Sequence, residues 1–169
     1  QYILREEKKM LAHEALQAII CNSELVRGEF MRYYQVPESK LVVIENGVDL
    51  TEFHPNLISE RERQRHVLGI PNDAPVFLFV GNGFERKGVS PLLKALARTK
   101  NKQSRLVIVG DDRRFASYER EASDLHISAR VTVAGPQKDV RPFYGAADVF
   151  VLPTLYDPMP NAALEAMAS

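Results

Sequence analysis

Residues 76–110 read VFLFVGNGFERKGVSPLLKALARTKNKQSRLVIVG, and this stretch decides the fold. Two apolar runs, 76–80 and 105–110, flank a segment whose apolar residues, among them Leu92 and Leu96, recur at helical spacing. Neither run alternates apolar with polar residues, which is typical of strands buried on both faces of a parallel sheet. The stretch therefore predicts a strand, a helix and a second, parallel strand.

The same pattern extends to both sides of this stretch. Further strand-like runs lie at residues 18–21, 41–45, 130–135 and 148–153, and segments with helical periodicity separate most of them. Strands that alternate with helices along a chain favour a parallel sheet covered on both faces. We therefore predict an α/β fold with a doubly wound parallel sheet of the Rossmann-like type.

We predict a domain boundary near residues 46–56, where the hydrophobic periodicity of helices and strands is lost. Residues 1–46 contain two strand-like runs, which are too few for an independent sheet. We predict that residues 1–50 are the last elements of a first domain plus a linker, and that residues 51–169 belong to a second domain. We expect both domains to continue outside this sequence, because its first residue falls within a helical pattern and its final helix has no stop signal.

Composition narrows the classes of function. The 169 residues carry 22 basic and 22 acidic side chains, a net charge of +0 that argues against a nucleic-acid-binding protein. The single cysteine, Cys21, lies in an apolar run and is expected to be a buried thiol. With no disulfide framework, a reducing compartment is favoured. No apolar run approaches the roughly 20 residues of a membrane span, so we expect a cytoplasmic protein.

The first candidate binding loop is GNGFERKG, residues 81–88. Ligands of open α/β sheets bind beyond the carboxyl ends of the strands, and this loop follows such an end. Gly81 and Gly83 permit close approach of the backbone to a ligand, while Arg86 and Lys87 add positive charge before a helix. This combination suits a phosphate or diphosphate, although the loop lacks the end of a Walker motif. The alternative is an ordinary solvated turn.

The second candidate loop is PTLYDPMPNAALEA, residues 153–166. Asn161 is a plausible N-cap, so the amides of residues 160–163 are expected to face an anion at a helix N-terminus. Asp157 and Glu165 lie eight positions apart and could hold hydroxyl groups on either side of a diphosphate. Alternatively, both carboxylates merely stabilise the local turn and helix.

Weaker signals lie in two other loops. The segment GPQKDV, residues 135–140, could offer backbone groups to a flat base, or it could be an ordinary turn. The acidic residues 111 and 112 belong to a further loop on the same edge of the predicted sheet. The 4 histidines have neither metal-ligand spacing nor a nucleophile partner, so we interpret them as surface or packing residues and predict no metal site.

The ordered motifs carry a family resemblance. In sequence order they are NGVD (46–49), FVGNGFERKG (79–88), LVIVG (106–110), VTVAG (131–135), AADVFVLPT (146–154) and D-x7-E (157–165). This series resembles the carboxyl-terminal domain of glycosyltransferase family 4. The sequence of these motifs is most similar to that of the lipopolysaccharide core glucosyltransferase I group.

The resemblance implies a GT-B enzyme of two Rossmann-like domains, in which the N-terminal domain holds the acceptor and the C-terminal domain holds the donor. It implies transfer of a hexose from a nucleoside-diphosphate sugar, most often a UDP-sugar, to lipopolysaccharide or polysaccharide, with retention of configuration and without a metal. Lys87, with Arg86 nearby, would neutralise the leaving diphosphate, Glu165 would hold the ribose, and Asp157 would hold the donor sugar. The remaining donor contacts that it implies are Gly81, Asn82, Gly83, Asp139, Val140, Pro160, Asn161 and Ala162.

This sequence departs from the family at two of these positions. Asp157 replaces the usual glutamate and is one methylene shorter, and Asn82 stands where many members carry arginine. Two other functions remain open: a nucleotide-sugar 2-epimerase, and a non-catalytic nucleotide-binding module. We expect the 169-residue chain alone to be inactive in transfer, because the acceptor contacts fall outside it. Any contact with the inner face of a bacterial inner membrane is likewise expected outside it.

Overall fold

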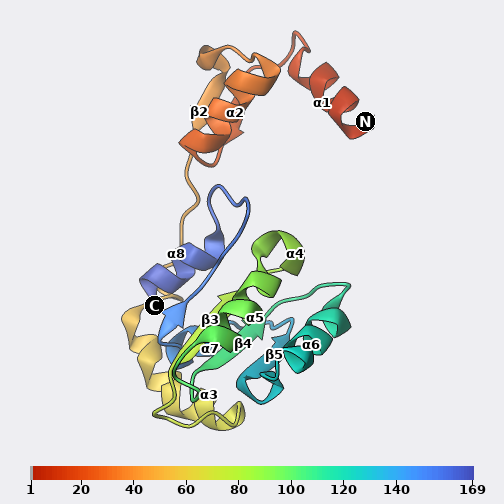
Figure 1. The fold of residues 1–169 in the computed structure, drawn as a ribbon. Coiled ribbons are helices and arrows are strands. Elements are labelled where there is room, and N and C mark those ends of the chain that lie inside the picture. The colour runs from red at the N-terminus through yellow and green to blue at the C-terminus, as the bar shows by residue number, and fades with distance from the viewer. Residues whose placement is uncertain (1) are drawn as a thin grey trace. The chain divides into compact units, whose positions relative to one another are not determined.

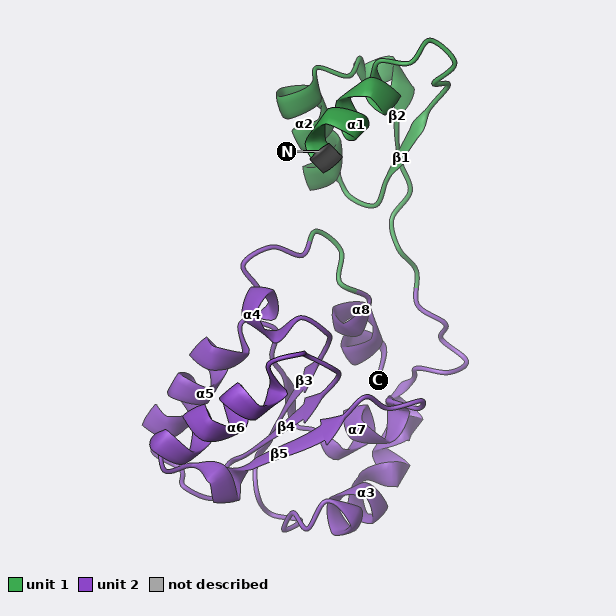
Figure 2. Ribbon diagram, turned by 90° about the vertical axis from the view of Figure 1, so that its right-hand side faces the viewer, with its two compact units in different colours: residues 1–47, 158–160 green, residues 48–157, 161–169 purple. Residues whose placement is uncertain are grey.

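The computed structural model describes residues 2–169 (Figure 1). The chain forms two compact units, which are considered separately (Figure 2). The first comprises the residues up to Gly47 together with Pro158–Pro160, and the second comprises Val48–Asp157 and Asn161–Ser169. The assignment of these parts to an acceptor domain and a donor domain stays a prediction.

The first unit is small. Its elements are α1 (Tyr2–Leu11), β1 (Ile19–Cys21), α2 (Glu24–Tyr34), a 3-10 turn η1 (Glu38–Lys40) and β2 (Leu41–Val43). The strands β1 and β2 are parallel, with Ile19 opposite Leu41. Cys21 is fully buried beneath α2, which confirms the expected buried thiol.

The second unit is an α/β layer structure. Its strands are β3 (Val76–Val80), β4 (Arg105–Val109), β5 (Val131–Gly135) and β6 (Val149–Phe150), and its helices are α3 (Arg61–Val67), α4 (Phe84–Lys87), α5 (Val89–Arg98), α6 (Phe115–Asp124), α7 (Arg141–Ala146) and α8 (Asn161–Ala168). The strands form one parallel sheet in the order β5-β4-β3-β6. Two 3-10 turns, η2 (Pro55–Glu60) and η3 (Ser128–Arg130), precede α3 and β5. This arrangement confirms the predicted fold class.

The sheet separates two hydrophobic cores. On β4, Leu106 and Ile108 join the cluster beneath α5 and α6, while Val107 and Val109 join the cluster beneath α7. Figure 2 shows α5 and α6 on one side of the sheet and α3 and α7 on the other. The central strands β3 and β4 are therefore covered on both faces, which explains why their sequences do not alternate.

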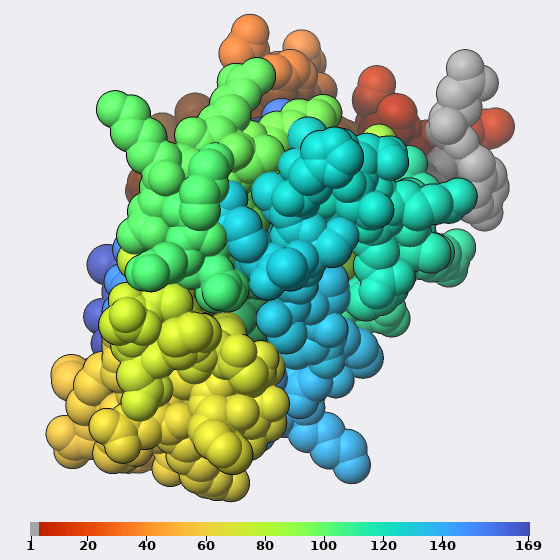
Figure 3. All heavy atoms as spheres, turned by 60° about the horizontal axis from the view of Figure 1, so that its bottom comes forward, coloured from red at the N-terminus to blue at the C-terminus, as the bar shows by residue number. Residues whose placement is uncertain are grey.

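A buried arginine ties the start of the sheet to α3. Arg65 is fully buried, donates to the carbonyl oxygens of Asn72 (2.7 Å) and Ala74 (2.9 Å), and pairs with Asp148 (2.8 Å). The same Asp148 oxygen accepts the amide of Val76 at 2.7 Å. The yellow atoms of α3 and its following turn lie against neighbouring green and cyan segments in the space-filling view (Figure 3). This network fixes the beginnings of β3 and β6, and sequence reasoning missed it.

One expected strand needs correction. The expected strand 148–153 is only Val149–Phe150, because β6 pairs with β3 alone at the sheet edge and Pro153 has no amide to extend the ladder. Helix α3 begins at Arg61, directly after the 3-10 turn η2. No helix among the described residues is long and apolar enough to span a bilayer.

Candidate functional site

The carboxyl ends of the parallel strands bring four loops of the second unit to one edge of its sheet. The β3–α4 loop begins at Gly81, the β4–α6 loop at Gly110, and the β5–α7 loop after Gly135. The segment after β6 leads through Asp157 toward α8. Most residues predicted to bind the donor therefore lie on this edge, as expected for an open α/β sheet.

The predicted phosphate loop is partly helical. Residues 84–87 form the short helix α4, so Arg86 and Lys87 occupy its last two positions rather than an irregular loop. Gly83 and Gly88 flank α4 with φ values of 71° and 82°, a left-handed conformation that glycine adopts without strain. The sequence did not reveal this helix because one turn is too short to show periodicity.

Two glycines of this loop allow close contacts. A side-chain carbon added at Gly81 would lie 2.8 Å from Cδ of Lys87, so this glycine leaves the space in which the lysine lies. One added at Gly88 would lie 2.1 Å from the carbonyl oxygen of Pro153. The loop after β6 thus packs directly on the junction between α4 and α5.

Lys87 and Asp157 form an ion pair at this edge. Lys87 Nζ donates to Asp157 Oδ2 at 2.7 Å, and only 13% and 14% of the two side chains are exposed. Arg86 Nη1 lies 3.9 Å from the same oxygen and donates to the carbonyl of Tyr156 at 2.5 Å. The structure thus brings together three predicted residues from two loops that are 70 positions apart in sequence.

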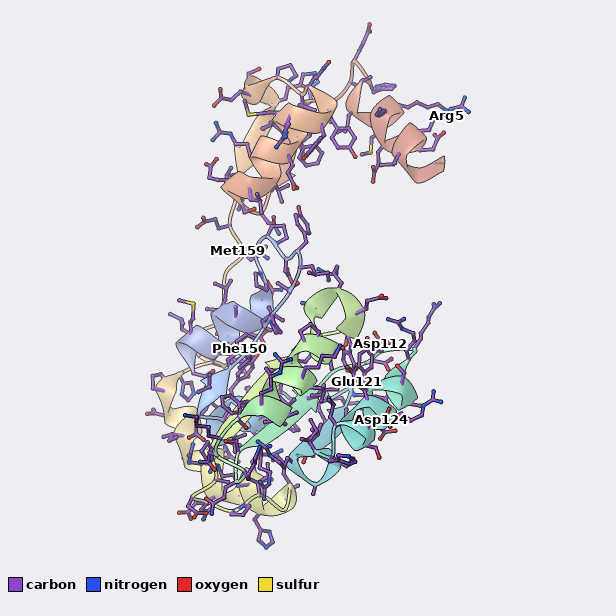
Figure 4. All side chains as sticks on the ribbon, viewed as in Figure 1. Arg5, Asp112, Glu121, Asp124, Phe150 and Met159 are labelled. Carbon is purple, nitrogen blue, oxygen red and sulfur yellow. The ribbon has the colours of Figure 1, made fainter. Side chains whose placement is uncertain are left out.

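Asn82 holds a neighbouring loop. Its side-chain oxygen accepts the amide of Asp111 at 2.8 Å, and Asp112 Oδ2 accepts the amide of Phe84 at 2.7 Å (Asp112 is labelled in Figure 4). Asn82, Gly83 and residues 111–114 line an open hollow of about 500 Å³. Asp111 and Asp112 therefore stabilise the phosphate loop, a role that the sequence did not predict for them.

Glu165 pairs with a tyrosine that sequence reasoning missed. Tyr144 Oη donates to Glu165 Oε2 at 2.7 Å and lies 3.1 Å from the carbonyl oxygen of Ala162. Burial, followed by the hydrogen bond to Glu165, raises the pKa of Tyr144 far above its ordinary value. The hydroxyl therefore remains protonated at neutral pH and can donate to the carboxylate. The available sequence signal was a tyrosine in an apolar helix, because a buried phenol requires a hydrogen-bond partner.

The predicted base-contacting residues lie at the start of α7. Asp139 accepts hydrogen bonds from Arg141 through the main-chain amide (3.0 Å), Nε (2.8 Å) and Nη2 (2.9 Å). Val140 packs its side chain against the core between the sheet and α7. The side chains of Asp139 and Val140 are thus engaged within the protein, and their backbone groups are the candidates for base recognition.

The remaining predicted contacts surround the start of α8. Pro160 belongs to the segment counted with the first unit, in which Asn46 Nδ2 donates to the carbonyl of Met159 at 2.9 Å. Asn161 is the first residue of α8 and not its N-cap, because the fixed φ of Pro160 lets the helix begin directly after it. The carbonyl oxygen of Ala162 lies 3.1 Å from Tyr144 Oη.

Among residues 2–169, no group of three His, Cys, Asp or Glu side chains is placed to hold a metal ion. His13, His66 and His126 are exposed and His54 is half-buried. Whether the reaction needs a metal stays a prediction.

Comparison with known families gives two matches. The family "Glycosyl transferases group 1" matches residues 60–169, and "Glycosyltransferase Family 4" matches residues 1–52. The lipopolysaccharide core biosynthesis glycosyltransferase LpsE of Rhizobium meliloti (strain 1021) is 40% identical over 104 residues, which cover 62% of this chain and 30% of LpsE. These matches confirm the resemblance found in the motifs.

Two further similarities extend over most of the chain. The UDP-Gal:alpha-D-GlcNAc-diphosphoundecaprenol alpha-1,3-galactosyltransferase of Escherichia coli is 30% identical over 168 residues, 95% of this chain and 43% of the relative. The crystal structure of WaaG, described as a glycosyltransferase involved in lipopolysaccharide biosynthesis, superimposes with a TM-score of 0.78 at 26% identity, covering 88% of this chain and 41% of WaaG. This chain therefore spans less than half the length of these relatives.

Proposed function

This chain belongs to the group 1 glycosyl transferases, and we propose that its second unit binds the nucleoside-diphosphate sugar of a retaining sugar-transfer reaction. The observation that carries the proposal is the Lys87–Asp157 pair at the carboxyl edge of the sheet. A cation suited to phosphate and a carboxylate suited to hydroxyl groups lie 2.7 Å apart. Such a juxtaposition fits the point where a sugar joins its diphosphate.

Each part of the donor has a proposed counterpart. Lys87 contacts the diphosphate, Asp157 a hydroxyl of the sugar, and Glu165 the ribose hydroxyls. The backbone of the glycine loop, with Gly81 and Gly83, and the amides of Asn161 and Ala162 complete the phosphate contacts, because free amides at a helix N-terminus favour anions. The backbone at Asp139 and Val140 faces the base, and Pro160 borders the sugar.

The chemistry follows from the charges. The bond between the anomeric carbon and the diphosphate oxygen breaks, a bond to an acceptor hydroxyl oxygen forms, and the proton of that hydroxyl passes to an oxygen of the leaving diphosphate. Negative charge develops on the leaving diphosphate, and Lys87 stabilises it by proximity, a task that a metal performs in other transferases. We therefore propose that transfer proceeds without a divalent metal and survives a chelator.

Donor and acceptor are proposed from the relatives. The E. coli relative named for UDP-Gal supports a UDP-hexose, and LpsE and WaaG support a lipopolysaccharide or related glycan as acceptor. We place the acceptor site in the part of these relatives that this chain does not span. Contact with the inner face of a bacterial inner membrane belongs to that part as well.

Incubation of the protein with a radiolabelled UDP-hexose, with and without a lipid-linked glycan acceptor, tests the proposal. Label should enter the acceptor only when the acceptor-binding part of the enzyme is present, with EDTA having no effect. Conversion of the UDP-sugar without acceptor would instead indicate an epimerase. Failure of UDP, ADP and GDP to bind would refute the proposal.

A further inference from the structure

We infer that Tyr144 is a positioning residue, whose hydroxyl orients the Glu165 carboxylate so that one carboxylate oxygen is left to receive the ribose. This inference rests on the proposed function, because it assumes that Glu165 holds the ribose. It assigns a role in donor recognition to a residue on α7 that makes no proposed contact with the donor itself.

The hydrogen-bond geometry defines the orientation. Tyr144 Oη lies 2.7 Å from Oε2 of Glu165 and 3.1 Å from the carbonyl oxygen of Ala162. A phenol has a single proton, and the shorter contact to a charged acceptor is the stronger one. The proton is therefore donated to Oε2, which fixes the rotation of the carboxylate and leaves Oε1 for another donor.

The tyrosine is rigid enough for this task. Tyr144 is only 7% exposed, and its ring packs edge-on against that of Phe53, with the two ring centroids 5.8 Å apart. The ring centroid of Phe150, a residue labelled in Figure 4, lies 6.2 Å from that of Tyr144. A ring held in this way cannot follow a moving carboxylate, so Glu165 must come to the hydroxyl. Preorganisation of this kind lets a contact form without a further ordering cost.

The Tyr144 hydroxyl remains protonated over the working range of enzymes. Burial and the adjacent Glu165 carboxylate keep the phenol protonated, since both raise its pKa. Tyr144 is consequently a fixed donor and not a general acid or base, which separates a positioning role from a catalytic one.

The variant Tyr144→Phe keeps the packed ring and removes only the hydroxyl. Calorimetric titrations with UDP and with 2′,3′-dideoxy-UDP then separate positioning from a merely structural role, because the second ligand lacks the hydroxyls that Glu165 would bind. We expect Tyr144→Phe to weaken UDP binding about five- to tenfold and to change binding of the dideoxy ligand less than about twofold. Equal weakening of both ligands, or of neither, would overturn the inference.

Two further variants complete the test. Tyr118→Phe removes a hydroxyl from another buried ring, one that pairs with Arg114, and should leave UDP binding unchanged. In a Glu165→Ala background, Tyr144→Phe should cause no additional loss, because its effect passes through the carboxylate. A full additional loss in that background contradicts positioning, even if Tyr144→Phe alone is less stable.

The titrations also distinguish failure of this inference from failure of the proposed function. If the wild-type protein binds UDP no better than the dideoxy ligand, Glu165 does not hold the ribose and the inference falls with that assignment. If the wild type discriminates and Tyr144→Phe discriminates equally well, only the inference about Tyr144 is wrong.

Discussion

The substitution Lys87→Ala tests the proposed donor site most directly. It removes the ammonium group that lies 2.7 Å from Asp157 Oδ2 and leaves that carboxylate, of whose side chain 14% is exposed, with the guanidinium of Arg86 as a partner 3.9 Å away. Two effects then act in the same direction: the diphosphate loses a charged donor, and a poorly compensated carboxylate repels it. A hydrogen bond to a charged group contributes about 1.5–3 kcal/mol, so we expect binding of UDP to weaken about 10- to 150-fold.

Calorimetry of UDP binding provides the measurement, with two matched controls. Arg86→Ala should weaken UDP about two- to fivefold, because its half-exposed guanidinium holds the Tyr156 carbonyl and is screened by solvent. Lys94→Ala removes an exposed lysine of α5 that pairs with Glu121, and should have no effect beyond the change in net charge. Retention of UDP affinity within twofold in Lys87→Ala would refute the reasoning, as would a larger loss in Arg86→Ala.

Three other predictions follow from named contacts. Gly81→Ala places a carbon 2.8 Å from the lysine side chain, at a φ of 156° that side chains rarely adopt, so UDP binding should weaken about tenfold by calorimetry and the melting temperature should fall. Asp157→Ala should weaken UDP-glucose and spare UDP, whereas Glu165→Ala should weaken both by a similar factor; equal loss of both ligands in Asp157→Ala would exclude its sugar role. Asp148→Ala leaves Arg65 buried without its carboxylate and should lower the free energy of unfolding by about 2–3 kcal/mol in urea titrations, since a third of the carboxylate is exposed and screened.

The pH dependence of stability follows from Asp148. Burial raises the pKa of this carboxyl, but hydrogen bonds from Arg61, the Val76 amide and Arg65 outweigh it, and the pKa lies below the usual 3.8. Because the pKa is lowered in the folded state, the stability that the Asp148 carboxylate contributes is fully present above pH 3.8 and is lost as the pH falls through the folded-state pKa. In urea titrations, the wild type should therefore lose stability below pH 3.8 more steeply than Asp148→Asn.

The fold could be predicted where burial on both faces makes a strand continuously apolar in sequence. The apolar runs at 76–80 and 105–110 became β3 and β4 almost to the residue, because both faces of these central strands are covered. The run at 148–153 gave a two-residue edge strand, since one neighbour and a proline limit its pairing. Strand position in a sheet is a tertiary property, and local sequence does not report it.

The candidate site was predictable as a set of loops but not as a set of contacts. Residues at the ends of parallel strands meet at one edge whatever their identity, so Lys87 and Asp157 could be placed there from the sequence. Their ion pair could not be foreseen, and neither could the bond between Tyr144 and Glu165, because each depends on helix and loop geometry set by distant packing. The roles proposed for these residues remain predictions.

The Lys87–Asp157 pair also bears on how the donor binds. An ammonium group has three donors, and Asp157 uses one at 2.7 Å, so two can meet phosphate oxygens without breaking the pair. Asp157 has a second oxygen, Oδ1, for a sugar hydroxyl. The pair can thus persist in the complex, linking the leaving group to the sugar through one salt bridge. Aspartate is one methylene shorter than the glutamate usual in the family, so its carboxylate reaches less far from the backbone of the loop after β6. In the proposed complex, recognition of the sugar is thus coupled to stabilisation of the leaving group, so the effects of substitutions at Lys87 and Asp157 should not be additive.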